Sequence, residues 1–152
     1  MCRFILTKEL GRLSKWLRIL GFDTIYYTSD NIGELIVQAL RDKRIIITKR
    51  KHVGDLKVIA VHKNDVKEQL KEVIEKLHLT INQSMMFRRC IVCNALLEEL
   101  TKEDCKGKIP DYVYNTQQEF YRCPACERIY WQGTHWGNVR RYLDEIKVVF
   151  SN

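Results

Sequence analysis

Two Cys-x-x-Cys pairs, Cys90/Cys93 and Cys123/Cys126, place the strongest constraint on how this chain can fold. Each pair brings two thiolates to one side of a tight turn, and two such turns complete a tetrahedral set of four sulfur ligands. Zinc suits this set because thiolates are soft ligands and Zn²⁺ accepts four-coordination without strain. We therefore predict a small zinc ribbon with a structural ion, since four protein ligands leave no open coordination position. An iron–sulfur cluster and a redox-active dithiol are the alternative interpretations.

The other candidate ligands have simpler interpretations. Cys2 and Cys105 lie outside the two pairs, and we expect both to act as small apolar residues. His135 follows the second pair closely, but with four cysteines available we expect it to make local hydrogen bonds instead.

The net charge of +7 is distributed unevenly along the 152 residues. Residues 1–86 contain 16 Lys and Arg against 10 Asp and Glu, so this half favours a polyanionic partner such as nucleic acid. No apolar run approaches the ~18 residues that a membrane helix needs, so we expect no membrane partner. Charges at Arg3, Lys8 and Glu9 interrupt any signal-peptide core. We expect a cytoplasmic protein whose thiols stay reduced.

The first half alternates between apolar runs and segments with helical spacing of leucine, isoleucine and valine. The runs predict strands near residues 2–6, 23–28, 45–48 and 56–62. Strands that alternate with helices indicate an α/β fold with a mainly parallel sheet covered on both faces. We expect Gly21 to end the first helix, and Asp30 and Asn64 to cap the next two. The predicted division is an α/β domain over 1–80 and a zinc ribbon with a C-terminal helix over 86–152.

The exit of the third predicted strand carries four cationic or ionisable side chains and no carboxylate. They are Lys49, Arg50, Lys51 and His52. Ligands of open α/β sheets bind beyond the carboxyl ends of the strands, so this cluster is a candidate site for RNA phosphates. A solvated polar loop is the alternative interpretation.

Two further groups of residues extend the candidate RNA-binding surface. Lys8, Arg12 and Lys15 lie at the start of the first helix, where Arg12, Lys15 and Arg18 also match the solvent face of an amphipathic helix. The second module interleaves arginine with aromatic residues, a pattern common at sites for looped or single-stranded RNA. We assign its Tyr130 and Trp131 mainly to the ribbon core and leave Trp136 and His135 open.

Several motifs together resemble the Mut-seven C-terminal RNase domain, a PIN-like ribonuclease domain followed by a zinc ribbon. They are LGRLSKWLRILGFDT, the IIITKRK strand exit, RCIVCNALL and FYRCPACERIYWQGTHWGNV, and they span roughly residues 4–139. The resemblance implies a PIN-like α/β/α sandwich. It also implies RNA cleavage that depends on a divalent metal, Mg²⁺ or Mn²⁺, held by carboxylates at the strand exits.

This chain departs from the family pattern at the positions of the acids. Thr7 stands where the family has Asp in D-x-x-L-G-R-L, and Arg50 and His52 stand where it has the acids of T-R-D-x-D. Glu34 is a family-like acid that is kept. At ~4 Å and an effective dielectric constant of ~20, Arg50 would repel each unit of cation charge by about 4 kcal/mol. The altered pocket should therefore accept phosphate in place of a metal ion.

Three functions remain open on this sequence. The favoured one is an RNA-binding protein on a degenerate nuclease scaffold, contacting structured RNA such as ribosomal or transfer RNA without cleaving it. The alternative is an active metal-dependent endoribonuclease, with no catalytic residue assigned beyond the candidate acids Glu34, Asp30, Glu9 and Asp55. The third is an adaptor whose zinc ribbon binds a protein partner in a larger assembly.

Overall fold

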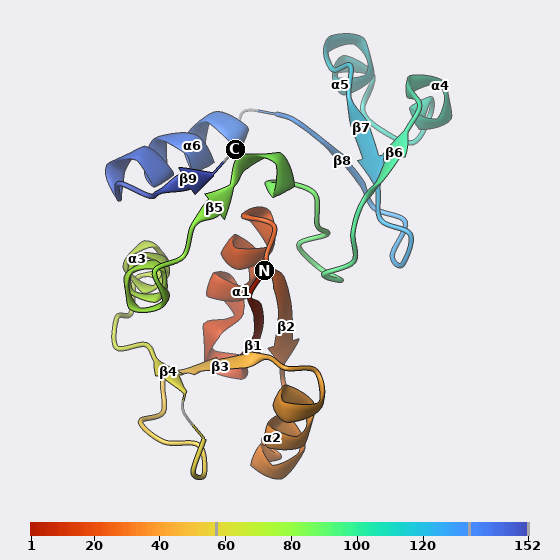
Figure 1. Ribbon diagram of the computed structural model, residues 1–152. Coiled ribbons are helices and arrows are strands. Elements are labelled where there is room, and N and C mark those ends of the chain that lie inside the picture. The colour runs from red at the N-terminus through yellow and green to blue at the C-terminus, as the bar shows by residue number, and fades with distance from the viewer. Residues whose placement is uncertain (57, 134, 152) are drawn as a thin grey trace.

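The computed structural model describes residues 1–56, 58–133 and 135–151, and the side chain of residue 135 lies outside this description. The first half of the chain forms the α/β domain (Figure 1). Its elements are β1 (Arg3–Thr7), the 3-10 turn η1 (Lys8–Leu10), α1 (Gly11–Ile19), β2 (Asp23–Tyr27), α2 (Ile32–Arg41), β3 (Ile45–Thr48), β4 (Ile59–Ala60), α3 (Val66–Leu77) and β5 (Ile81–Asn82).

The second half forms the ribbon and returns to the α/β domain (Figure 1). Its elements are η2 (Gln83–Met85), β6 (Glu98–Leu100), α4 (Lys102–Cys105), α5 (Asp111–Thr116), β7 (Phe120–Arg122), β8 (Ile129–Trp131), α6 (His135–Glu145) and β9 (Phe150–Ser151). Strands β6, β7 and β8 make an antiparallel sheet, and α4 and α5 lie in the insertion between the two cysteine pairs.

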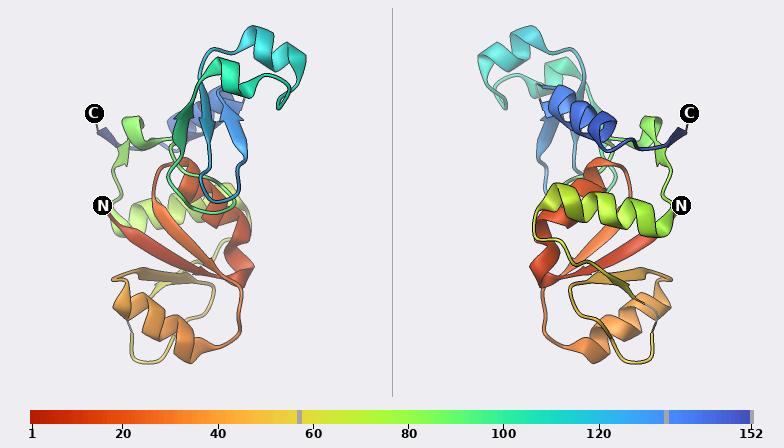
Figure 2. Two further views of the ribbon diagram at one scale, coloured as in Figure 1. Left: turned by 90° about the vertical axis from the view of Figure 1, so that its right-hand side faces the viewer. Right: turned by 90° about the vertical axis from the view of Figure 1, so that its left-hand side faces the viewer.

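The main sheet has the order β2-β1-β3-β4, and all of its strand pairs are parallel. Alternate residues of β1 point to opposite faces: Phe4 and Leu6 belong to the core beneath α1 and α3, whereas Ile5 packs with Leu35 of α2. Figure 2 shows the resulting layers, with α2 on one face of the sheet and α1 and α3 on the other. The predicted α/β/α sandwich with a mainly parallel sheet is confirmed.

The C-terminal helix α6 shares the larger core with the first half of the chain. Val139, Tyr142 and Leu143 of α6 are buried in the same cluster as residues of α1 and α3. Parallel pairing of β9 with β5 fixes the end of the chain beside the α/β domain. The division at residues 80–86 stays a prediction, and α6 provides a packing contact across it.

Two predicted helix caps are wrong, and one predicted helix end is confirmed. Asn31 caps α2 in place of Asp30, because its side chain accepts a hydrogen bond from the Glu34 amide. Asp65, and not Asn64, caps α3 by accepting from two amides of the first turn. Gly21 follows α1 with φ +92°, and an added Cβ would lie 2.5 Å from the Met85 carbonyl oxygen. Glycine at this position therefore allows η2, which connects the two halves of the chain, to approach the end of α1.

Replacing Leu143 with alanine should destabilise the α/β domain together with α6. Leu143 is fully buried, so the cavity should lower the free energy of unfolding by about 2–5 kcal/mol. Chemical denaturation monitored by circular dichroism measures this loss, with the exposed Val149→Ala as the control. A loss equal to that of the control would contradict the shared core.

Candidate functional site

The four paired cysteines form one compact metal-binding group. Their Sγ atoms all lie within 4.8 Å of one another. The two turns repeat the same backbone geometry, because Asn94 and Glu127, each following the second cysteine of its pair, have φ of 65° and 62°. Their amides donate to the carbonyls of Cys90 and Cys123 respectively, at 2.9 Å in both cases. The sequence spacing alone predicted this group.

The thiol chemistry of this group favours a bound cation. The hydrogen bond with Cys126 raises the pKa of the Cys93 thiol to about 12. Burial alone would raise the pKa of Cys90, but hydrogen bonds from Tyr130 and from neighbouring amides lower it to about 7, so one thiol of the first pair ionises far more readily than the other. Four neighbouring sulfurs cannot all ionise together without a compensating positive charge. A divalent ion supplies that charge, and a set of four thiolates suits Zn²⁺. These residues could therefore hold a zinc ion.

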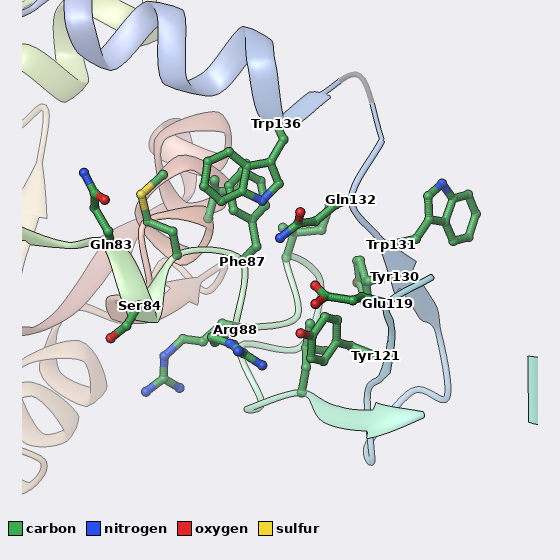
Figure 3. Close-up of a pocket in the computed structure, with 15 residues that line it drawn as sticks. Gln83, Ser84, Phe87, Arg88, Glu119, Tyr121, Tyr130, Trp131, Gln132 and Trp136 are labelled. Atoms are coloured by element: carbon green, nitrogen blue, oxygen red, sulfur yellow. The ribbon is translucent and has the colours of Figure 1, made fainter. Parts of the chain in front are cut away.

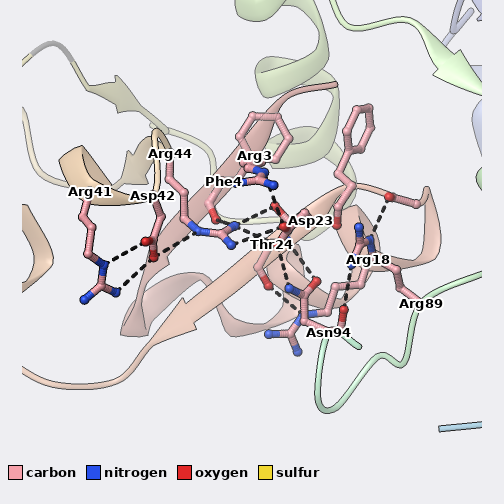
Figure 4. A network of polar contacts seen from close by, with 12 residues as sticks. Arg3, Phe4, Arg18, Asp23, Thr24, Arg41, Asp42, Arg44, Arg89 and Asn94 are labelled. Carbon is pink, nitrogen blue, oxygen red and sulfur yellow. Dashed lines mark hydrogen bonds and ion pairs between the residues drawn. The ribbon is translucent and has the colours of Figure 1, made fainter. Parts of the chain in front are cut away.

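Arg18 holds the first cysteine turn against the α/β domain (Figure 4). Although Arg18 was predicted on the solvent face of α1, its side chain is buried. Its Nη1 donates to the carbonyl oxygens of Ile91 and Val92 at 2.8 and 3.2 Å, and its Nε donates to that of Thr24 at 2.9 Å. A buried guanidinium is retained because backbone carbonyls satisfy its donors.

Asn94 and Asp23 complete the anchor beside Arg18. The Asn94 side chain accepts from the Thr24 amide at 2.9 Å and donates to an Asp23 carboxylate oxygen at 2.8 Å. Arg44 donates to both oxygens of the same carboxylate, at 2.8 and 3.2 Å. Arg89 adds hydrogen bonds to the carbonyls of Gly21 and Asn94. No sequence signal separated these residues from ordinary surface charges.

This anchor places the cysteine group away from the carboxyl ends of the strands. Asp23 is the first residue of β2, and Arg44 directly precedes β3, so both lie at the amino edge of the parallel sheet. An ion held by the cysteines is therefore remote from the strand exits and suits a structural role.

The carboxyl edge of the sheet brings Thr7 and Thr48 together. These residues end the neighbouring strands β1 and β3, both are buried, and their Oγ1 atoms are 3.0 Å apart in a hydrogen bond. The Arg50 amide donates to the Thr48 hydroxyl at 3.1 Å. The neutral Thr7 hydroxyl, bound to that of Thr48, thus fills the position where the family pattern has a carboxylate, whereas Thr48 matches the threonine of that pattern.

The predicted RNA-binding residues lie in three places: at the carboxyl edge of the sheet, in the loop after β3, and farther along α1. Lys8 lies at the carboxyl edge and pairs with Asp30 at 2.7 Å, and Lys49 donates to the Asn64 side chain at 2.6 Å. The hydrogen bond from Lys8 lowers the pKa of Asp30, and the charge of Arg50 adds to this effect. The next three residues, Arg50, Lys51 and His52, are exposed as the chain leaves β3.

Arg12 and Lys15 lie farther along α1, where they line a cleft between the α/β domain and the ribbon. The candidate ligand His135 begins α6, but its side chain lies outside the described residues. Tyr130 and Trp131 lie in different environments. The Tyr130 hydroxyl is 3.0 Å from Cys90 Sγ. Trp131 packs against the ribbon core, which consists of Cys105, Val113 and Phe120.

The acids near the carboxyl edge do not fit a catalytic metal site. Among the side chains described within residues 1–56, 58–133 and 136–151, the four cysteines are the one group of three or more His, Cys, Asp or Glu residues able to share an ion. Asp30 is engaged by Lys8, and Glu34 accepts a hydrogen bond from the Tyr27 hydroxyl at 3.3 Å. Mg²⁺ and Mn²⁺ need convergent oxygen ligands, which this edge does not supply.

Chelation of a metal ion held by the four cysteines should disorder the ribbon while leaving the main sheet protected. We expect hydrogen exchange to accelerate in β6, β7 and β8 after chelation, because the cysteine group closes this module. The strands β1 and β3 should keep their protection, since their core contains none of the four cysteines. Cys126→Ser should lower the bound zinc measured by metal analysis, and Cys2→Ser, outside the group, is the matched control. Equal protection of the ribbon with and without zinc would contradict a structural ion.

Asp23→Asn should make stability less sensitive to acid. Burial by itself would raise the pKa of Asp23, but hydrogen bonds from Arg44 and Asn94 lower it below its ordinary value of 3.8. A carboxylate with a lowered pKa stabilises the fold above about pH 4, and this contribution is lost as the pH falls through the folded-state pKa. Midpoints of urea denaturation, measured at pH values from above about pH 4 to below the folded-state pKa of Asp23, should fall less steeply with decreasing pH in the variant than in the parent protein. Asp55→Asn, at an exposed turn, should retain the parent slope.

A comparison with known protein families gives a match over most of the chain. The family model of the Mut7-C RNAse domain matches residues 2–143, nearly the whole chain, which confirms the resemblance noted from the motifs. No curated protein and no solved structure matches. Among the described residues, no helix is long and apolar enough to cross a membrane. The matched family indicates an RNA-related, nuclease-like role, with RNA as the expected partner. The chain belongs to the Mut7-C RNAse domain family.

Proposed function

We propose that this protein binds RNA at the carboxyl edge of its sheet without cleaving it, and that the zinc ribbon makes a second contact. The observation that carries the proposal is the hydrogen-bonded pair of Thr7 and Thr48 hydroxyls at the centre of that edge. A PIN-type site needs carboxylates at this position to hold the metal that activates water.

The charge of the edge supports phosphate binding in place of metal binding. Asp30 neutralises Lys8, but Arg50 is exposed and makes no side-chain ion pair within the described part of the chain. Arg50 presents a fork of N–H donors that matches phosphate geometry. A divalent ion about 4 Å from this guanidinium would be repelled by about 4 kcal/mol per unit charge at an effective dielectric constant of ~20. The same guanidinium attracts an RNA phosphate.

The exposed Lys51 and His52 extend this binding surface along the loop after β3. Neither side chain makes an ion pair with a described residue, so both remain available to the RNA backbone. Structured RNA, such as ribosomal or transfer RNA, is the proposed target. The proposed zinc ion stabilises the ribbon and takes no part in chemistry.

Arg50→Glu should lower RNA affinity at least about tenfold at low salt, because it replaces a phosphate contact with a repulsive charge. Filter retention or fluorescence anisotropy measures the Kd over a salt series, and the parent protein should lose affinity steeply as salt rises. Lys43→Glu makes the same charge change at an exposed position on the amino edge of the sheet and should have a much smaller effect. Equal affinities of the two variants would place the RNA elsewhere.

The family name gives a second candidate function, metal-dependent cleavage of RNA. This activity would require Asp30 and Glu34, together with further oxygen ligands, to hold a metal ion. Incubation of the purified protein with assorted RNAs in Mn²⁺ or in EDTA separates the two functions when binding and cutting are scored independently. Binding without cutting in both conditions is the expected result. Cutting that needs Mn²⁺ and disappears in Glu34→Gln would establish the nuclease and overturn the proposal.

A further inference from the structure

A large cleft lies where the α/β domain meets the ribbon and α6. Its volume is about 730 Å³. Its lining combines six aromatic side chains with three cations and contains no acid among the described residues. The aromatic residues are Trp16, Phe87, Tyr130, Trp131, Trp136 and Tyr142. This composition is complementary to the flat bases and the negative backbone of a nucleic acid.

Phe87 and Trp136 form the shared wall of this cleft and of a smaller neighbouring pocket of about 220 Å³ (Figure 3). Their rings are stacked, with centroids 4.9 Å apart and an angle of 22° between planes. Phe87 has φ +61°, an unfavourable conformation for a bulky residue, and its amide donates to the Ile19 carbonyl at 2.8 Å. The segment just after η2 thus keeps a strained backbone at Phe87, and this backbone holds the aromatic ring in the wall. Backbone strain of this kind is common at binding sites.

The indole nitrogen of Trp136 lies inside this wall. Nε1 is buried and has no hydrogen-bond partner among the residues that the structure describes. Figure 3 shows the Trp136 ring above Phe87, with its nitrogen on the side of Gln132. Because this atom is buried, the part of Trp136 that a ligand can contact in the cleft is its ring and not its N–H.

The cations of the cleft come from the helices of the α/β domain. Arg12 and Lys15 lie on α1, and Lys67 lies on α3 with its Nζ 4.9 Å from the Tyr142 ring centroid. Arg12 and Lys15 make no ion pair with a described residue. Because α1 follows Thr7 after only the short η1 turn, its exposed basic residues lead from the carboxyl edge of the sheet to the cleft.

We propose that this cleft binds unpaired bases of RNA, and that it selects RNAs with a single-stranded segment next to the phosphates gripped at the sheet edge. The inference rests on the proposed RNA-binding function and adds a distinct site to it. Bases stack against the aromatic wall, and Arg12, Lys15 and Lys67 attract the backbone between them. A duplex keeps its bases stacked inside and cannot make these contacts.

Tryptophan fluorescence provides a direct test, because all three tryptophans of the chain line the cleft. Titration with a short single-stranded RNA should quench the emission and give a lower Kd than the duplex of the same strand. Trp136→Leu should weaken binding of the single strand about fivefold or more, the loss expected for one base stack. Its effect on the duplex should be much smaller.

A second variant tests the cleft even where Trp136→Leu fails to fold. Arg12→Gln combined with Lys15→Gln changes only exposed side chains and should weaken the single-stranded RNA more than the duplex. Lys106→Gln combined with Lys108→Gln removes the same charge from the ribbon insertion and should leave the preference unchanged.

The two proposals fail in different ways. Absence of binding to any RNA would overturn the proposed function and this inference together. Salt-sensitive binding that depends on Arg50, with equal affinity for single strand and duplex and no response to the cleft variants, would overturn the cleft alone.

Discussion

The buried guanidinium of Arg18 is the interaction on which the arrangement of the two modules depends. It joins the end of α1 to the carbonyls of the first cysteine turn, while Asn94 ties that turn to the start of β2. Together with the burial of α6 against α1 and α3, this anchor fixes the ribbon beside the α/β domain and so forms the aromatic cleft. A buried charge requires nearly ideal partners, so the anchor also determines the orientation of the ribbon.

The two edges of the parallel sheet carry different kinds of side chain. The amino edge carries Asp23 and Arg44 and supports the cysteine group, whereas the carboxyl edge is open and basic. At the carboxyl edge, the Thr7 hydroxyl, bonded to that of Thr48, stands in place of an acid of the family pattern. The proposed RNA-binding function needs no metal ion at that position.

Most of the fold could be predicted because its signals are local. The apolar runs of β1 and β3 and the leucines of α1 indicate elements buried on the sheet, and they lie where expected. The caps of α2 and α3 were each misplaced by one residue, because neighbouring Asp and Asn residues have similar capping propensity. Arg18 was misassigned because helical periodicity distinguishes faces but does not reveal that a distant cysteine turn covers the end of one face.

The sequence by itself determined which residues have the chemistry for metal binding and for an apolar core, and it showed that acids of the family pattern are missing at Thr7 and Arg50. Cysteine spacing and hydrophobic period act over a few residues, so they are readable without coordinates. Only the tertiary structure decided that the Thr7 and Thr48 hydroxyls meet, and that Phe87 and Trp136 form one wall. Those distances depend on strand order and on packing between segments far apart in the chain, which no local pattern specifies.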